Sequence, residues 1–203
     1  TAPSSLSRLR AVLFDVDHTL LDFDRAERRA LREALASRGL PCPPSTVAAY
    51  KRINHDLWAA FRRGEITQDA LARERFARLL REIGASERGA ARLGETYLDH
   101  LSRHGDRLPG CRHVLRDLGR RFRLGVVTNG IDRVQRSRIA ASGLAPLFET
   151  VVTSQSCGFA KPDPRILHVA LDAMGVLPRH AVYVGDDPAT DGGAARAAGV
   201  RFV

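Results

Sequence analysis

The chain has 203 residues, of which 44% are hydrophobic and 27% are charged, a composition that fits a globular protein of one domain plus a smaller insert. Its 32 lysines and arginines outnumber its 23 acidic residues and give a net charge of +9. Only Lys51 and Lys161 of these cations are lysines, and the arginines are spread along most of the chain. We therefore interpret the charge as a solvated basic surface rather than a nucleic-acid-binding face.

The cysteines and the apolar runs indicate the cellular compartment. Cys42, Cys111 and Cys157 show no CxxC spacing, which argues against a disulfide scaffold and favours a reducing compartment. No uninterrupted apolar run approaches the ~20 residues of a membrane span. The first residues lack the apolar core of a secretory signal. The sequence predicts a cytoplasmic protein that binds neither membranes nor nucleic acid, and it leaves the oligomeric state open.

Five short apolar runs predict the strands of a parallel sheet. Helical patterns separate the later runs: Asp132 is a candidate N-cap of a helix that ends at Gly143, and Asp163 with Pro164 begins a helix that Gly175 closes. Alternating strands and helices indicate an α/β fold with a doubly wound parallel sheet. The predicted strands are Ala11–Phe14, Leu124–Val127, Thr150–Val152, Ala181–Val184 and Val200–Val203.

Residues 23–107 differ from the rest of the chain. They contain no convincing strand and several amphipathic helical segments, and Ser45, Thr67 and Ser86 stand where helix N-caps belong. The sequence therefore predicts a helical cap domain at 23–107, inserted into a core formed by 1–22 and 108–203.

A pair of carboxylates follows the first predicted strand. Asp15 and Asp17, in the motif Asp15–Thr19, lie two residues apart at a strand end and could face a common site. One carboxylate could attack a phosphorus atom while the other donates a proton to the leaving oxygen. The alternative reading is a helix cap in a solvated turn.

Two further clusters suit a phosphate group. Thr128, Asn129 and the backbone at Gly130 offer hydroxyl, amide and N–H donors directly after a strand, although a simple turn has the same composition. Lys161, one of only two lysines among 32 basic residues, suggests that a compact ammonium is needed there rather than a forked guanidinium. The alternative is a loop lysine ahead of a helix.

The fourth cluster predicts a magnesium site. Asp186, Asp187 and Asp191 follow the strand Ala181–Val184, and crowded carboxylates repel one another unless a cation is bound. The alternative is a helix N-terminus with capping acids. Ligands of doubly wound sheets bind at the carboxyl ends of the strands, where all four clusters fall, so the set predicts one site.

The ordered motifs DxDxT, TN, KP and GDxxxxD resemble those of haloacid dehalogenase superfamily phosphatases with a helical cap between the first two motifs. The resemblance covers essentially the whole chain. It implies that Asp15 is a nucleophile forming an aspartyl-phosphate, and that Asp17 is first the acid for the leaving alcohol and then the base for water. Thr128 and Asn129 would hold the phosphoryl oxygens, and Lys161 would neutralise charge.

The resemblance also implies a magnesium ion. Asp15, the main-chain carbonyl of Asp17, and Asp186 would be its ligands, and Asp191 would bind through water or brace the lysine. One residue departs from the family's pattern, because His18 replaces the glycine that is usual after the second aspartate. We expect little effect, since the backbone is the relevant group there.

The helical insert resembles one particular subfamily of these phosphatases. Asn54–Trp58 and Phe61–Thr67 are similar to the N-x-x-L-W…G-x-I-T stretch of bacterial noncanonical pyrimidine 5′-nucleotidases, and Leu21–Asp24 is similar as well. This implies a small phosphorylated metabolite, most simply a pyrimidine nucleoside 5′-monophosphate, with Asn54 and Trp58 as candidate substrate contacts.

Several alternative functions stay open at this point. Other phosphatases of the superfamily act on N-acylneuraminate 9-phosphate or phosphoglycolate. A haloacid dehalogenase is a further enzyme candidate, although it needs neither a metal nor a leaving-group acid, and Asp17 and Asp186 therefore favour the phosphatase. A basic nucleic-acid-binding or regulatory module is the non-enzyme alternative, and the complete set of catalytic motifs argues against it.

Overall fold

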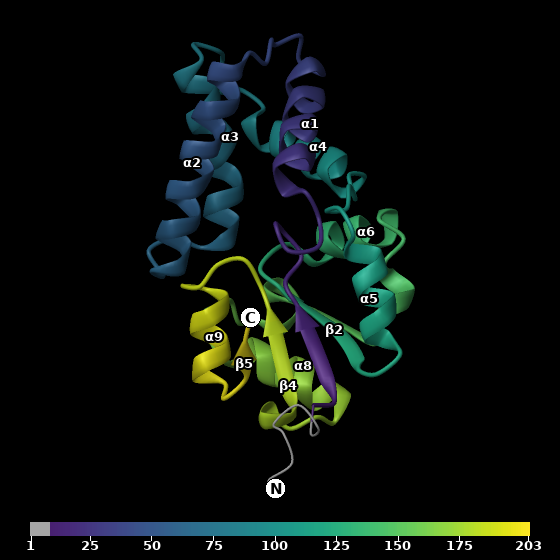
Figure 1. Ribbon diagram of the computed structural model, residues 1–203. Helices are drawn as coiled ribbons and strands as arrows, with labels where there is room; N and C mark the ends of the chain where they lie inside the picture. Colours follow the sequence, from purple (N-terminus) through teal and green to yellow (C-terminus); the bar gives the residue numbers. More distant parts are fainter. Residues whose placement is uncertain (1–8) are drawn as a thin grey trace, which may run out of the picture. The chain divides into compact units, whose positions relative to one another are not determined.

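The computed structural model describes residues 9–203, except for the side chains of residues 62 and 68 (Figure 1). The chain divides into two compact units, a sheet unit made of residues up to Asp24 and from Gly105 onward, and a helical unit, Arg25–His104. The sequence predicts these boundaries between residues 22 and 23 and between residues 107 and 108. Among the described residues, no helix has both the length and the apolar character that crossing a membrane requires.

Among residues 9–203, the sheet unit contains five parallel strands in the order β3-β2-β1-β4-β5, which confirms the predicted α/β fold with a doubly wound sheet. Two strands end one residue later than predicted, at Thr128 and Thr153, and the first of these also begins one residue earlier, at Arg123. The last strand is shorter than predicted at both ends. The bounds are β1 Ala11–Phe14, β2 Arg123–Thr128, β3 Thr150–Thr153, β4 Ala181–Val184 and β5 Arg201–Phe202.

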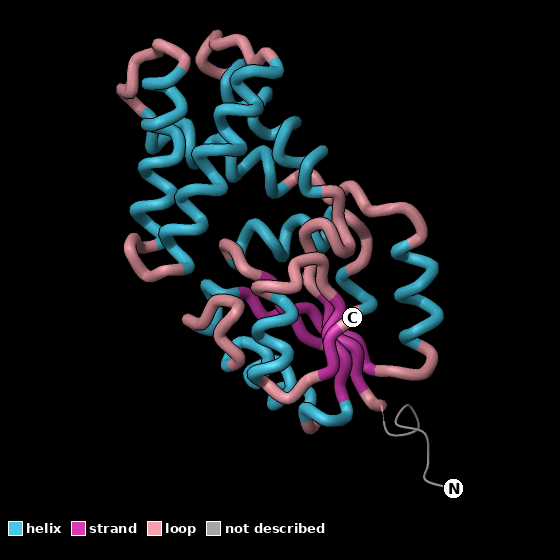
Figure 2. Tube along the Cα trace, turned by 60° about the vertical axis from the view of Figure 1, so that its left-hand side comes forward, coloured by secondary structure: helices cyan, strands magenta, loops and turns pink. Residues whose placement is uncertain are grey.

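Helices cover both faces of the sheet, as Figure 2 shows for the magenta strands. The alternation along β1 explains the two layers: Ala11 and Leu13 pack toward α8 and α9, whereas Val12 and Phe14 pack toward α5 and α6. The helices of this unit are α5 Cys111–Gly119, α6 Asp132–Ala141, α7 Ser154–Cys157, α8 Arg165–Met174 and α9 Asp191–Ala197, with short 3-10 turns at Ala145–Leu147 and Pro178–His180.

Two predicted helix starts were displaced by one residue. Asp132 is the first residue of α6 rather than its N-cap, which is Ile131. Asp163 precedes the N-cap Pro164, and its carboxylate accepts a hydrogen bond from the Arg165 amide. Gly175 ends α8 in the left-handed conformation, as predicted.

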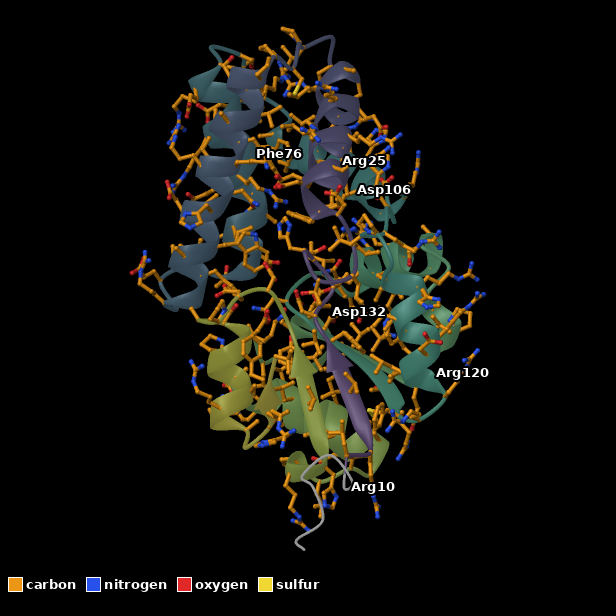
Figure 3. All side chains as sticks on the ribbon, viewed as in Figure 1. Arg10, Arg25, Phe76, Asp106, Arg120 and Asp132 are labelled. Atoms are coloured by element: carbon orange, nitrogen blue, oxygen red, sulfur yellow. The ribbon has the colours of Figure 1, made fainter. Side chains whose placement is uncertain are left out.

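The helical unit has an aromatic interior. Helix α3 packs against both α2 and α4, and the rings of Tyr50, Phe76 and Tyr97 meet with centroids 5.3–5.6 Å apart. Phe76, labelled in Figure 3, is fully buried there. The helices are α1 Phe23–Ala36, which begins in the sheet unit, α2 Pro44–Arg62, α3 Gln68–Glu82 and α4 Ala90–Ser102.

One of the three predicted caps of this unit is present. The Thr67 hydroxyl accepts a hydrogen bond from the Ala70 amide at the start of α3. Ser45 lies inside α2, because prolines already begin that helix, so its predicted role was wrong. The prediction for Ser86 was wrong as well, since α4 begins four residues later, after a left-handed glycine.

Candidate active site

The strand register brings the predicted clusters to one edge of the sheet. Phe14, the last residue of β1, is aligned with Val126 on β2 and with Val184 on β4. The chain segments that follow these three strands therefore leave the sheet side by side. They carry the Asp15 cluster, the Thr128 cluster and the Asp186 cluster.

Lys161 contacts three polar side chains at this edge of the sheet. Its Nζ lies 2.6 Å from Oδ1 of Asp15 and 2.6 Å from Oδ1 of Asp191, and it donates to the Tyr183 hydroxyl at 2.9 Å. The lysine and both carboxylates are buried, with exposed side-chain fractions of 8% or less. The Tyr183 hydroxyl in turn donates to the carbonyl of Val127 on β2, at 2.8 Å.

Burial and charge shift the protonation equilibria in this cluster. Burial raises the pKa of Asp15 from 3.8 to about 6, against the opposing charge of Lys161 and with the help of nearby Asp191 and Asp17. Burial alone lowers the pKa of Lys161, but the carboxylates around it outweigh that effect and raise this pKa well above its usual value. The lysine therefore stays charged, and Asp15 is a carboxylate at neutral pH.

Asn129 fixes the lysine's backbone. Its side-chain amide donates to the carbonyl of Lys161 at 3.1 Å and accepts from the Lys161 amide at 2.8 Å. This pair of bonds joins the loop after β2 to the loop ahead of α8. The Thr128 side chain is also buried at this edge, with 1% of its surface exposed.

Three carboxylates gather where the sequence predicts a cation. Oxygen atoms of Asp15, Asp186 and Asp191 all lie within 4.8 Å of one another. Burial raises the pKa of Asp186, and the charge of His18 opposes that rise. A donor set made only of oxygen suits a hard divalent ion, and one ammonium cannot balance three carboxylates, so these residues fit Mg²⁺.

The Asp17 side chain contacts two residues of α6. Arg138 Nη1 lies 2.5 Å from its Oδ1, and Gln135 Nε2 donates to its Oδ2 at 3.0 Å. Neither partner was recognised from the sequence, because an arginine and a glutamine on a helix are typical of its solvent-exposed face. A usable signal was their i, i+3 spacing on the helix that directly follows Thr128 and Asn129.

The two candidate substrate residues lie in the helical unit. The Asn54 side chain is mostly buried, accepting from Arg75 Nη1 at 3.1 Å and donating to Glu27 Oε1 at 3.4 Å. Trp58 is half-buried one turn later on α2, with its ring edge-on to that of Phe61 at 5.6 Å. The structure thus leaves the indole more accessible than the amide.

Comparisons with known proteins identify the family of the chain. The haloacid dehalogenase-like hydrolase family matches residues 12–203. The HAD-hydrolase YfnB of Bacillus subtilis is 34% identical over 92% of this chain and 79% of its own length, and the pyrimidine 5′-nucleotidase PynA of Streptococcus pneumoniae is 33% identical over 89% and 76%.

Solved structures show the same likeness. The crystal structure of YfnB bound to magnesium superposes with a TM-score of 0.89 at 33% identity, over 96% of this chain and 86% of that one. A family match over nearly the whole chain, relatives above 30% identity and the four motifs at one sheet edge lead to one conclusion. The chain belongs to the haloacid dehalogenase-like hydrolases.

Proposed function

We propose that this hydrolase is a magnesium-dependent phosphatase that cleaves a small phosphomonoester through an aspartyl-phosphate on Asp15. One observation carries the proposal: a buried carboxylate is held by an ammonium at 2.6 Å, at a sheet edge that also carries hydroxyl and amide donors and two further carboxylates. A phosphoryl dianion needs such neutralising and donating groups.

The proposed reaction consists of two successive displacements at phosphorus. In the first, a carboxylate oxygen of Asp15 forms a bond to phosphorus as the ester P–O bond breaks, and Asp17 gives its proton to the leaving alkoxide. In the second, Asp17 takes a proton from water, which displaces the carboxylate and releases phosphate. Lys161 already holds Oδ1 of Asp15, so we assign the attack to Oδ2.

The neighbouring groups hold the phosphoryl oxygens and the cation. Thr128 and Asn129 would donate to those oxygens, while Lys161 balances the charge of Asp15. Asp15, the main-chain carbonyl of Asp17, and Asp186 would hold Mg²⁺, with Asp191 bracing the lysine at 2.6 Å. When bound, the ion would supply the positive charge that lets a phosphate dianion approach several carboxylates.

We propose a pyrimidine nucleoside 5′-monophosphate as the substrate. The support is the motif likeness in α2 and the similarity to PynA, a pyrimidine 5′-nucleotidase. Trp58 offers a half-buried indole that suits the face of a base. Asn54 stays a predicted contact, although Arg75 and Glu27 engage its amide in this structure.

The test is phosphate release from a panel of nucleotides, sugar phosphates, phosphoglycolate, N-acylneuraminate 9-phosphate and p-nitrophenyl phosphate. We expect turnover that disappears in EDTA, returns with Mg²⁺, and is abolished by Asp15→Asn in a folded protein. Pyrimidine 5′-monophosphates should rank first, and Trp58→Ala should raise KM for them more than for p-nitrophenyl phosphate. A different top substrate would reject the nucleotide assignment alone.

The other candidate functions give different results in the same assay. A dehalogenase would release halide from 2-haloacids without metal and leave the phosphate esters intact. A regulatory or nucleic-acid-binding module would turn over none of these compounds. Either result would contradict the phosphatase proposal.

A further inference from the structure

Two buried side chains of α6 contact two separate groups of the proposed site. Gln135 has 3% of its surface exposed and Arg138 has 1%. Gln135 Nε2 donates both to Oδ2 of Asp17 and to Oγ1 of Thr128, each at 3.0 Å. Arg138 Nη1 donates to Oδ1 of Asp17 at 2.5 Å. The proton-transferring carboxyl and the phosphoryl-binding hydroxyl are thereby joined through one helix.

Arg138 also fixes which way the Gln135 amide faces. Its Nη1 donates to Oε1 of Gln135 at 2.9 Å, and a guanidinium has no acceptor. The amide oxygen must therefore face Arg138, and the NH₂ group must face Asp17 and Thr128. Because Thr128 Oγ1 accepts from this NH₂ group, its own proton is free to be donated elsewhere, as a phosphoryl oxygen requires.

Arg138 is a buried guanidinium that pairs directly with a carboxylate of the proposed site, at 2.5 Å. Burying a guanidinium is unfavourable unless it is paired, so this position depends on Asp17. The neighbouring arginines of α6, Arg133 and Arg136, lie exposed, so the helix has a solvated face for cations. Arg138 instead packs against the face of the Phe23 ring, with its Cζ 5.3 Å from the ring centroid, and forms an ion pair with Asp17.

We propose that Gln135 and Arg138 are positioning residues, which together hold the Asp17 carboxyl in place for proton transfer and orient the Thr128 hydroxyl toward the phosphoryl group. The inference rests on the proposed phosphatase function and adds two residues to it. Neither residue touches the substrate in this assignment, and each acts through Asp17 or Thr128.

The two half-reactions provide a readout that a structural role would not move. p-Nitrophenolate leaves without an acid, whereas both an alkoxide leaving group and the attacking water depend on Asp17. In Gln135→Met and Arg138→Met we expect a p-nitrophenolate burst within about 3-fold of the wild-type rate, followed by a steady state slowed about 10²-fold. kcat for an alkyl phosphate should fall by a similar factor without a burst. Stopped-flow absorbance and phosphate release measure these quantities.

Three further variants complete the experiment. Arg136→Met is the matched control, since Arg136 bonds to Asp132 and to the Val151 carbonyl rather than to the site. Arg138→Lys keeps a cation near Asp17, and its steady-state rate should be at least ten-fold higher than that of Arg138→Met. In an Asp17→Asn background, Arg138→Met should cost less than about 3-fold, because residues that act through one group are not additive.

The outcomes distinguish the positioning roles from the proposed phosphatase function. The inference is overturned if the burst rate and the steady-state rate fall by the same factor, or if Arg138→Met lowers the rate about 10²-fold in the Asp17→Asn background as well. Both residues would then have structural roles, and the phosphatase proposal would still stand. Should Arg138→Met fail to fold, the smaller change Gln135→Met decides by the same criteria. A wild-type protein that releases no phosphate from any ester would overturn the proposed function, and the inference with it.

Discussion

Each of the two units buries a cation against aromatic rings, but the charge around the two cations differs. Lys161 in the sheet unit is 4% exposed and lies 5.6 Å from the centroid of the Tyr183 ring; Arg75 in the helical unit is 6% exposed and lies 5.8 Å from that of Tyr50. Arg75 bonds to the Asn54 amide, which bonds to the single carboxylate of Glu27. Lys161 faces Asp15 and Asp191, and Asp186 adjoins them, so three carboxylates share one ammonium.

We interpret the Arg75 network as structural and the Lys161 cluster as the reactive one. Arg75 contacts an amide and aromatic rings within the helical unit, and these contacts serve the packing of helices. A site with excess negative charge is unfavourable until a cation enters, and such strain concentrates where ligands bind. We therefore expect the loss of Lys161 to lower activity and the loss of Arg75 to lower stability.

The largest effect is expected from Lys161→Met. The change removes the ammonium that contacts Asp15 and Asp191 and that holds Oδ1 of Asp15, so we expect kcat to fall by at least ~10³-fold. Lys161→Arg should recover only part of the loss, since a planar fork does not fit where a compact ammonium contacts three partners. Phosphate release at saturating Mg²⁺ is the measurement. A loss below ten-fold would show that the lysine is not required for charge balance.

Arg75→Met should act on stability instead. Losing the cation removes the buried hydrogen bond to Asn54 and the packing of the guanidinium against three aromatic rings, so we expect the free energy of unfolding to fall by about 3 kcal/mol. Urea unfolding measures this, with Arg78→Met on the exposed face of α3 as the control, expected to stay within about 0.5 kcal/mol. kcat for p-nitrophenyl phosphate should be unchanged in the folded protein. A large fall in kcat would mean that this network also serves the reaction.

The sequence was informative where chemistry follows strand ends and uninformative where side chains meet across helices. Asp15, Thr128 and Asp186 could be placed together because parallel strands bring their carboxyl ends to one edge. The partners of Asp17 could not, since the contact of Arg138 with a residue 121 positions away depends on tertiary packing. Asn54 shows the same limit: its motif suggests a substrate contact, but its hydrogen bonds lie inside the helical unit.

A smaller effect links the excess charge to pH. The pKa of Asp15 is raised above its unfolded value, to about 6, so in the absence of metal its contribution to stability is complete below pH 4 and is lost as pH rises through 6. Two pKa units correspond to at most about 3 kcal/mol. In the proposed site Mg²⁺ would bind the ionised carboxylates, so the rise in Tm that it causes should be larger at pH 7.5 than at pH 5. Ca²⁺ and EDTA serve as controls in the thermal unfolding series, and a metal-induced shift independent of pH would contradict the assignment of Asp15 as a ligand.

The smallest predicted effect concerns the turn that carries Asp17. His18 has φ of 61°, and every other described residue with φ in the left-handed range is a glycine, including Gly39, Gly64 and Gly84, which follow α1, α2 and α3. A side chain in this conformation costs about 1–2 kcal/mol, and glycine's larger unfolded-state entropy offsets part of the gain from its removal. His18→Gly should therefore raise the free energy of unfolding by about 1 kcal/mol, and His18→Asn by less, because asparagine tolerates the left-handed region better than histidine does. Two contributions oppose this gain: the edge-on contact of the His18 ring with Phe23, at 5.7 Å between centroids, and the attraction between the His18 charge and the Asp186 carboxylate. Urea unfolding in EDTA isolates these effects from metal binding; a lower stability of His18→Gly would show that the two contacts of His18 outweigh the backbone strain.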